Sequence, residues 1–191
     1  MNRLAFALTA SAALFVAAPA RADVSSWLAF GGGAGFEHSP AAGGVNAGAG
    51  LFTASIGVGT SPRKPFVFGG MFRSVTYFGL GTDVGVAARF ASGGFARGQW
   101  GAAFDIGPEI RSFGAYGRYP IQGIFTLGMP YGFQVGVGAQ ALNLGGDPQP
   151  FGGFAIFEID ILRLTVMRQG KTDQAWWNAS PAGGHLNEPE P

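Results

Sequence analysis

Hydrophobic and polar residues alternate with a period of two along most of the chain, and helical periodicity is nearly absent beyond residue 22. Side chains in a β-strand point alternately to opposite faces, so this period predicts strands with one apolar and one polar face. Glycine, proline, serine and asparagine gather between the alternating segments, as in turns. The pattern predicts eight strands, at residues 25–36, 47–59, 65–73, 77–90, 97–111, 119–129, 132–142 and 151–168.

The two faces of these strands differ in chemistry. One carries Phe, Val, Ile and Trp, and the other carries Gly, Ala, Ser, Thr, Gln and a few charges. The contrast is clear in four strands, but the register of 119–129 cannot be assigned. The whole chain has only two lysines, whereas a soluble surface needs many well-solvated residues. The polar faces are therefore expected inside a closed barrel and the apolar faces toward lipid; the side chains expected to meet lipid are Phe52, Ile56, Val84, Phe90, Trp100, Phe104, Ile106 and Val135.

The charged residues of the polar faces are expected to pair with one another, because a charge inside a narrow barrel is costly unless it is paired. Arg73 can lie on the same face as this set. Such a network would fill the lumen and oppose an open pore. The expected members are Asp83, Arg89, Asp105, Glu109, Arg111, Glu158, Asp160 and Arg163.

The last segment, FAIFEIDILRLTVMR at 154–168, changes phase midway. A β-bulge at Ile161 and Leu162 would place Glu158, Asp160 and Arg163 on one side of a continuous strand. The alternative is a strand that ends near Leu162.

The N-terminus indicates export. Arg3 precedes an apolar run, and Ala20-Arg21-Ala22 matches a cleavage site, so residues 1–22 are expected to be a signal peptide. Residues 23–168 would form the barrel, and 169–191 a polar C-terminal tail. The chain has no cysteine, and without Arg3 and Arg21 it has 10 basic and 11 acidic residues, so nucleic acid is not an expected partner. Charged residues make up 12% of the chain, about half the usual share for a soluble domain.

The chain resembles the small eight-stranded outer-membrane β-barrels of Gram-negative bacteria, such as the OmpA transmembrane domain, OmpX and OmpW. The resemblance rests on the signal peptide, the number of strands, their alternation and the lack of cysteine. The resemblance covers roughly residues 25–168. It implies an all-β, antiparallel, up-and-down transmembrane barrel with both ends of the chain in the periplasm. It also implies outer-membrane lipid and the barrel-assembly machinery as partners. The family usually ends its last strand in a terminal aromatic residue, whereas here residues 169–191 follow.

Candidate chemistry is sparse, and no enzyme activity, cofactor or metal is expected. Asp105 and Glu109 lie about 13 Å apart along a strand, too far for the carboxylate pair of a retaining glycosidase. His38-Ser39 resembles the His/Ser pairing of lipid A deacylases, but adjacent residues face opposite ways on a strand and Pro40 follows. The leading hypothesis is an outer-membrane barrel with a structural or surface-interaction role. Its alternatives are a soluble periplasmic lipocalin-like barrel that binds an apolar ligand, and a lipid-modifying barrel enzyme.

Overall fold

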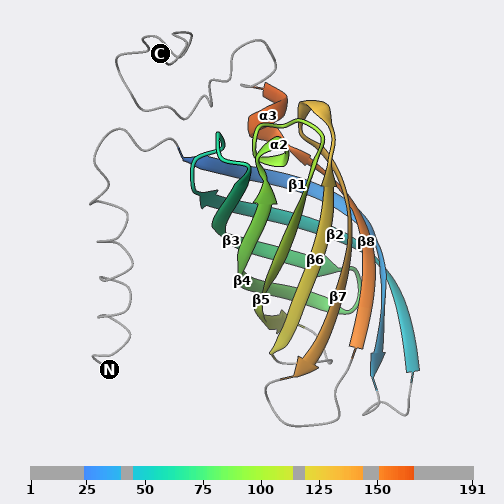
Figure 1. Ribbon diagram of the computed structural model, residues 1–191. Helices are drawn as coiled ribbons and strands as arrows, with labels where there is room; N and C mark the ends of the chain where they lie inside the picture. The colour runs from blue at the N-terminus through green and yellow to red at the C-terminus, as the bar shows by residue number, and fades with distance from the viewer. Residues whose placement is uncertain (1–23, 40–44, 114–118, 144–150, 166–191) are drawn as a thin grey trace, which may run out of the picture.

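The computed structural model describes residues 24–39, 45–113, 119–143 and 151–165. Within them the chain forms a closed barrel of eight antiparallel strands, each paired with its neighbours in sequence order, as predicted (Figure 1). The elements are β1 Ser25–Ser39, β2 Val45–Gly59, β3 Phe66–Tyr77, β4 Gly81–Ser92, α2 Gly93–Ala96, β5 Gly101–Phe113, β6 Pro120–Gly128, η2 Pro130–Gly132, β7 Phe133–Asn143, β8 Phe151–Asp160 and α3 Ile161–Thr165.

The barrel closes where β1 pairs with β8, from Ala29 opposite Asp160 to His38 opposite Phe151. The backbones approach closely at this seam. A Cβ atom added to Gly33 would lie 1.9 Å from the carbonyl oxygen of Ala155, so only glycine fits there. The glycines of β1 therefore contribute to closure rather than to a phosphate-binding loop.

The two ends of the barrel differ. α2, η2, α3 and the turn at 60–65 lie at one end, which we call the helical end, together with the start of β1 (Figure 1). The turn at 78–80 lies at the opposite end, where β1 and β5 finish; we call this the loop end. Both described ends of the chain, residues 24 and 165, thus lie at the helical end.

The structure corrects the prediction for the last strand. β8 stops at Asp160, and α3 follows without a bulge. The Asp160 Oδ1 atom accepts hydrogen bonds from the backbone N–H groups of Leu162, at 3.0 Å, and Arg163, at 3.3 Å. An aspartate in this position satisfies N–H groups that a new helix leaves without partners, so it favours a helix over a longer strand. The alternative, a strand ending near Leu162, is close to the observed boundary.

Four other expected boundaries are wrong by three or more residues, and one of them is the start of β4, which lies at Gly81 and not at residue 77. β1 continues to Ser39, where a loop was expected from residue 37, and β3 continues to Tyr77, where a turn was expected at 74–76. The fifth strand begins at Gly101 and not at residue 97, because Ser92 caps α2 and turns the chain before β5. A strand that began at residue 97 would place Gln99 on the inward face with Asp105, whereas in the structure Gln99 lies before β5 and is exposed. The expected signal peptide (1–22) and tail (169–191) lie outside the described residues.

Candidate functional site

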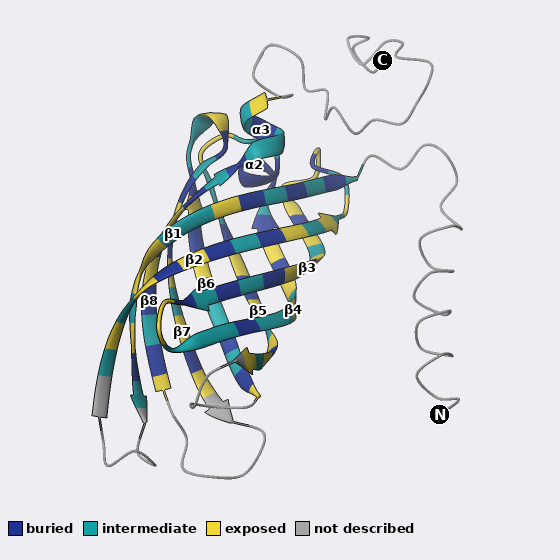
Figure 2. Ribbon diagram, turned by 180° about the vertical axis from the view of Figure 1, so that it is seen from behind, coloured by how far each residue is buried: buried dark blue, intermediate teal, exposed yellow. Residues whose placement is uncertain are grey.

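Charge is distributed unequally between the inside and the outside of the barrel. Among the described residues, every aspartate and glutamate is buried: Glu37, Asp83, Asp105, Glu109, Glu158 and Asp160. The side chains of Arg73, Arg89, Arg111 and Arg163 are buried with them. Figure 2 shows the corresponding alternation of buried and exposed positions along the strands. The interior, where a soluble protein has an apolar core, thus contains many polar and ionic side chains beside its apolar ones.

Large apolar side chains occupy the outer face. Of the eight side chains expected to face lipid, Phe52, Ile56, Phe90, Phe104, Ile106 and Val135 expose between 41% and 55% of their surface. Val84 is half-buried on the same face. Trp100 is 69% exposed, but it lies just before β5, at the helical end, rather than within a strand. A water-soluble protein seldom exposes so extended an apolar surface.

The structure brings the eight predicted charged residues into the interior, but it divides them into separate groups. Asp83, Glu109 and Arg111 lie toward the loop end, and Arg89, Asp105 and Glu158 lie toward the helical end. Asp160 and Arg163 form an ion pair at the helical end itself.

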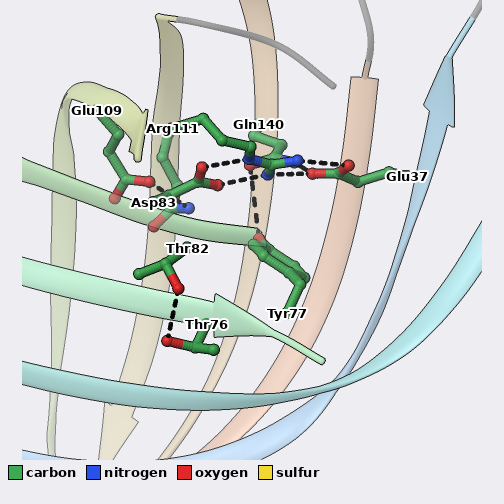
Figure 3. A network of polar contacts seen from close by, with 9 residues as sticks. Glu37, Thr76, Tyr77, Thr82, Asp83, Glu109, Arg111 and Gln140 are labelled. Carbon is green, nitrogen blue, oxygen red and sulfur yellow. Dashed lines mark hydrogen bonds and ion pairs between the residues drawn. The ribbon is translucent and has the colours of Figure 1, made fainter. Parts of the chain in front are cut away.

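Arg111 is the centre of the loop-end group, which we call the loop-end network: Glu37, Asp83, Glu109, Arg111, Gln122 and Gln140. Arg111 donates to both carboxylate oxygens of Asp83, at 2.6 and 2.7 Å, and to both of Glu37, one at 2.7 Å (Figure 3). The planar guanidinium thus holds two carboxylates, one on each side. The Gln140 amide donates to Glu37, and the Gln122 amide donates to Glu109 at 3.0 Å.

The helical-end network consists of Thr53, Arg73, Arg89, Asp105 and Glu158. Arg89 donates to both oxygens of Asp105 at 2.6 Å, and Arg73 donates to Asp105 at 3.1 Å. Arg73 also lies 3.9 Å from Glu158, which accepts a hydrogen bond from the Thr53 hydroxyl at 2.7 Å. Two arginines thus face two carboxylates. The rings of Trp27 and Phe95 lie 5.0 and 5.2 Å from the Arg89 guanidinium, within cation–π range.

Arg163 links three elements at the helical end. It pairs with Asp160 and donates to the backbone carbonyl oxygens of Ala96, at 2.5 Å, and Ser26, at 3.0 Å. One side chain therefore joins α3 to both α2 and β1. Burial lowers the pKa of the Arg163 guanidinium, and the Asp160 carboxylate opposes that shift. These contacts close this end of the barrel and include no reactive group.

Two apolar clusters separate the polar groups. Between the networks lie Leu51, Val75, Tyr77, Ile124, Phe154 and Ile156, and around Arg89 lie Trp27, Val67, Met71, Ala91, Phe95, Ala96 and Ala103. Large side chains thus fill the lumen along its length. That arrangement suits a barrel of eight strands, which leaves room for little more than side chains.

Sequence reasoning missed Glu37 and Gln122, whereas Gln140 lies on the polar face expected to point inward but was not assigned to the network. Glu37 was placed in a loop, although it continues the odd-numbered inward series of β1 that includes Trp27 and Ala29. The odd residue number of Glu37 was therefore the feature of the sequence that could have placed it inside the barrel. Gln122 belongs to the segment whose register could not be assigned, because Ile124 beside it also faces inward.

His38, the candidate base, lies on the outer face of β1, with its ring 4.9 Å from that of Phe151. The neighbouring carboxylate, Glu37, points the other way and is held by Arg111. Within the described ranges, no group of three or more His, Cys, Asp or Glu side chains is arranged to hold a metal ion. None of the helices in the described part of the chain is long and apolar enough to cross a membrane.

Comparisons with protein-family models, with curated proteins and with solved structures each returned no match.

Proposed function

We propose that this protein is an integral outer-membrane β-barrel with a structural or surface-interaction role, and that its lumen is closed by the two ionic networks. The observation that carries the proposal is the inverted distribution of residues. In the described part of the chain the carboxylates are all inside, and most large apolar side chains of the strands are outside. A closed barrel satisfies every backbone hydrogen bond without water, as the bilayer interior requires.

The positions of tryptophan and tyrosine support the same proposal. The described Trp and Tyr side chains that point outward are Trp100, Tyr119 and Tyr131. Trp100 and Tyr131 lie at the helical end, whereas Tyr119 lies at the start of β6, at the loop end. Phe, Val and Ile occupy the surface between them. An apolar band with amphipathic aromatic residues at both edges is typical of membrane barrels.

Strand length agrees with this arrangement. The strands contain 9 to 15 residues, and about 9–11 residues cross a bilayer at the usual tilt. The soluble lipocalin-like alternative requires the apolar faces to line the interior, which is the opposite of the arrangement of Phe52, Phe90 and Phe104.

Fractionation of cells that express the full chain tests the proposal. We expect the protein in the outer-membrane fraction, extracted only by detergent. On a gel, the unheated sample should run faster than the boiled sample, because a folded barrel stays compact in detergent. Recovery as a soluble periplasmic protein would overturn the proposal.

The closed lumen is tested separately. We expect no stable conductance steps when the purified barrel is inserted into planar bilayers. Regular single-channel steps from the wild-type chain would contradict the closed lumen without affecting membrane insertion.

A further inference from the structure

An apolar groove lies on the outer face of the barrel and opens at the helical end. It has a volume of about 260 Å³ and crosses β3, β4, β5 and β6. Phe66 is the first residue of β3 and Ser92 is the last of β4, so the groove begins at the edge of the barrel. We call it the edge groove; its outer-face lining includes Phe66, Phe68, Phe90, Ser92, Ala102 and Phe104.

The size of the side chains explains the hollow. Ser92 and Ala102 are small, whereas the rings of Phe68 and Phe90 meet edge to face beside them, with centroids 5.5 Å apart. The Ser92 Oγ atom accepts hydrogen bonds from the backbone N–H groups of Phe95, at 3.3 Å, and Ala102, at 3.1 Å. The one hydroxyl of the lining is thus engaged by the backbone. The edge groove therefore suits an apolar or aromatic occupant rather than a polar one.

The described part of the chain ends close to the edge groove. α3 stops at Thr165, at the helical end, and Arg163 within it donates to the carbonyl oxygen of Ala96 in α2 at 2.5 Å. α2 begins directly after Ser92, which lines the groove. Residues 166–191, which follow α3 in the sequence, thus start at the same end of the barrel as the groove.

Two adjacent tryptophans interrupt the polar composition of residues 169–191. They are Trp176 and Trp177, half of the four tryptophans in the chain. A tryptophan side chain buries about 150–250 Å² when it packs, and its indole N–H requires a polar partner or water. Such a pair favours an apolar surface that borders on water, as the edge groove does at the end of the barrel.

We propose that the Trp176-Trp177 pair docks in the edge groove of its own barrel, with an indole ring among the phenylalanines. A cavity of about 150 Å³ holds a benzene ring, so a groove of about 260 Å³ has room for the larger indole ring. An indole can add edge-to-face contacts like that between Phe68 and Phe90, which a lipid acyl chain cannot. The inference goes beyond the proposed function and does not depend on it, because docking needs only the groove and the tryptophan pair.

The length of the chain permits this docking. Trp176 follows Thr165 by eleven positions, and eleven extended residues span up to about 36 Å. β4 lies four strands from β8 around the wall, about 20 Å at the usual spacing of strands. A short tether also holds the pair at an effective concentration of about millimolar near the groove. The chain's own tryptophans are therefore favoured over a second protein as the occupant.

Disulfide trapping tests the docking, because the chain has no cysteine of its own. One cysteine replaces Asn178, directly after the pair, and the other replaces Leu127, an exposed residue opposite Ala102. The matched control is N178C/L28C. Leu28 is half-buried on the outer face of β1, the strand whose Ser26 carbonyl oxygen accepts a hydrogen bond from α3. A tail that does not dock should therefore reach it at least as readily.

The mature full chain is folded in lipid vesicles at high dilution and then oxidised. We expect N178C/L127C to form an intramolecular disulfide about ten-fold faster than N178C/L28C. Equal rates would overturn the inference, and would leave lipid as the occupant of the groove. A disulfide that joins two chains would also overturn it, because the pair would then dock on another copy.

Further variants separate docking from the effect of the tether. Added to the first cysteine pair, W176A/W177A should lower the rate to that of the control, whereas W176F/W177F, which keeps two aromatic rings, should retain most of it. A102L, which fills the groove, should also lower the rate. A88L, outside the groove on the outer face of β4, should leave it unchanged. A rate that survives W176A/W177A would contradict the role of the tryptophans.

Each variant must first show the heat-dependent gel mobility of the folded barrel, and A102V replaces A102L if that variant does not fold. Failure of the proposed function looks different from failure of this inference. A chain that stays soluble without detergent refutes the membrane barrel, and the same cysteine pairs then test the docking in buffer. Equal rates in a barrel that requires detergent refute only the docking.

Discussion

The two ionic networks inside the barrel use the same kinds of ion pair, but only one of them has equal numbers of cations and anions. In the helical-end network Arg73 and Arg89 face Asp105 and Glu158, two cations for two anions. In the loop-end network Arg111 alone serves Glu37 and Asp83, with Glu109 nearby and bonded only to the amide of Gln122 among the contacts described. The first network shares its charge among several partners, whereas the second depends on one guanidinium.

The barrel is expected to be more vulnerable to a substitution at the loop end than at the helical end. Breaking a buried ion pair costs more than the pair contributes, because it leaves a charge in a low-dielectric site without compensation. An arginine lost from the helical-end network leaves a second arginine in contact with Asp105. An arginine lost from the loop-end network leaves its carboxylates with neutral amide partners and no cation.

The largest effect is therefore expected for Arg111→Ala. Removal of the guanidinium leaves Glu37 and Asp83 buried without a cation, at a cost of about 3–5 kcal/mol in the free energy of unfolding. The variant should lose its compact gel form at a clearly lower temperature than the wild type. An unchanged unfolding temperature would refute the network as a stabilising element.

A smaller effect is expected for Asp105→Asn. The amide oxygen still accepts one hydrogen bond, and Glu158 still lies 3.9 Å from Arg73. Arg89 loses its only described carboxylate partner but keeps the rings of Trp27 and Phe95, so part of the compensation remains. We expect a loss of about 2 kcal/mol in the free energy of unfolding, measured in urea with the barrel in detergent. If Asp105→Asn proves more harmful than Arg111→Ala, the contrast between the networks is reversed.

Glu109→Gln should have almost no effect. Its one described hydrogen bond comes from the neutral Gln122 amide, and the loop-end network already has an excess of negative charge. We expect a change within about 0.5 kcal/mol in either direction in the same urea measurement. A loss comparable with that of Arg111→Ala would mean that Glu109 carries charge compensation that the contacts do not show.

The smallest expected effect is the coupling energy between the two networks, that is, the difference between the loss in a double variant and the sum of the losses in the two single variants. The side chains of Leu51, Val75, Ile124 and Phe154 lie between them, and no hydrogen bond described here joins one to the other. The double variant R111A/D105N should lose the sum of the two single losses, to within about 0.5 kcal/mol. A larger coupling energy would show that the two act as one network.

Much of the inside-outside assignment could be predicted from the sequence, because a period of two fixes which residues share a face. Asp83, Asp105 and Arg111 were placed in the lumen, and Phe52 and Phe104 on the outer face, from parity alone. Parity fails where both faces carry the same kind of residue. In β6 the inward Ile124 and the outward Phe125 are both large and apolar, so alternation there says nothing about register.

The boundaries could not be predicted, because they depend on contacts between distant segments. Glu37 lies in a strand because β1 is hydrogen-bonded to both β2 and β8 at that position, although the Pro40-Ala-Ala-Gly-Gly that follows favours a loop. Arg163 reaches the interior through a helix that Asp160 caps, and not through a strand. The division into two networks likewise depends on registers between strands that no single segment specifies.

The central claim is that the outer face meets lipid, and the absence of cysteine makes it directly testable. Spin labels would be attached to single cysteines at Ala88 and Val137 on the outer face and at Arg63 in the turn of the helical end, with the chain in lipid vesicles. We predict that molecular oxygen, which concentrates in the bilayer, relaxes the labels at Ala88 and Val137, whereas a water-soluble nickel chelate relaxes only the label at Arg63. Strong relaxation of the labels at Ala88 and Val137 by the nickel chelate would contradict the claim, because it would place that face in water.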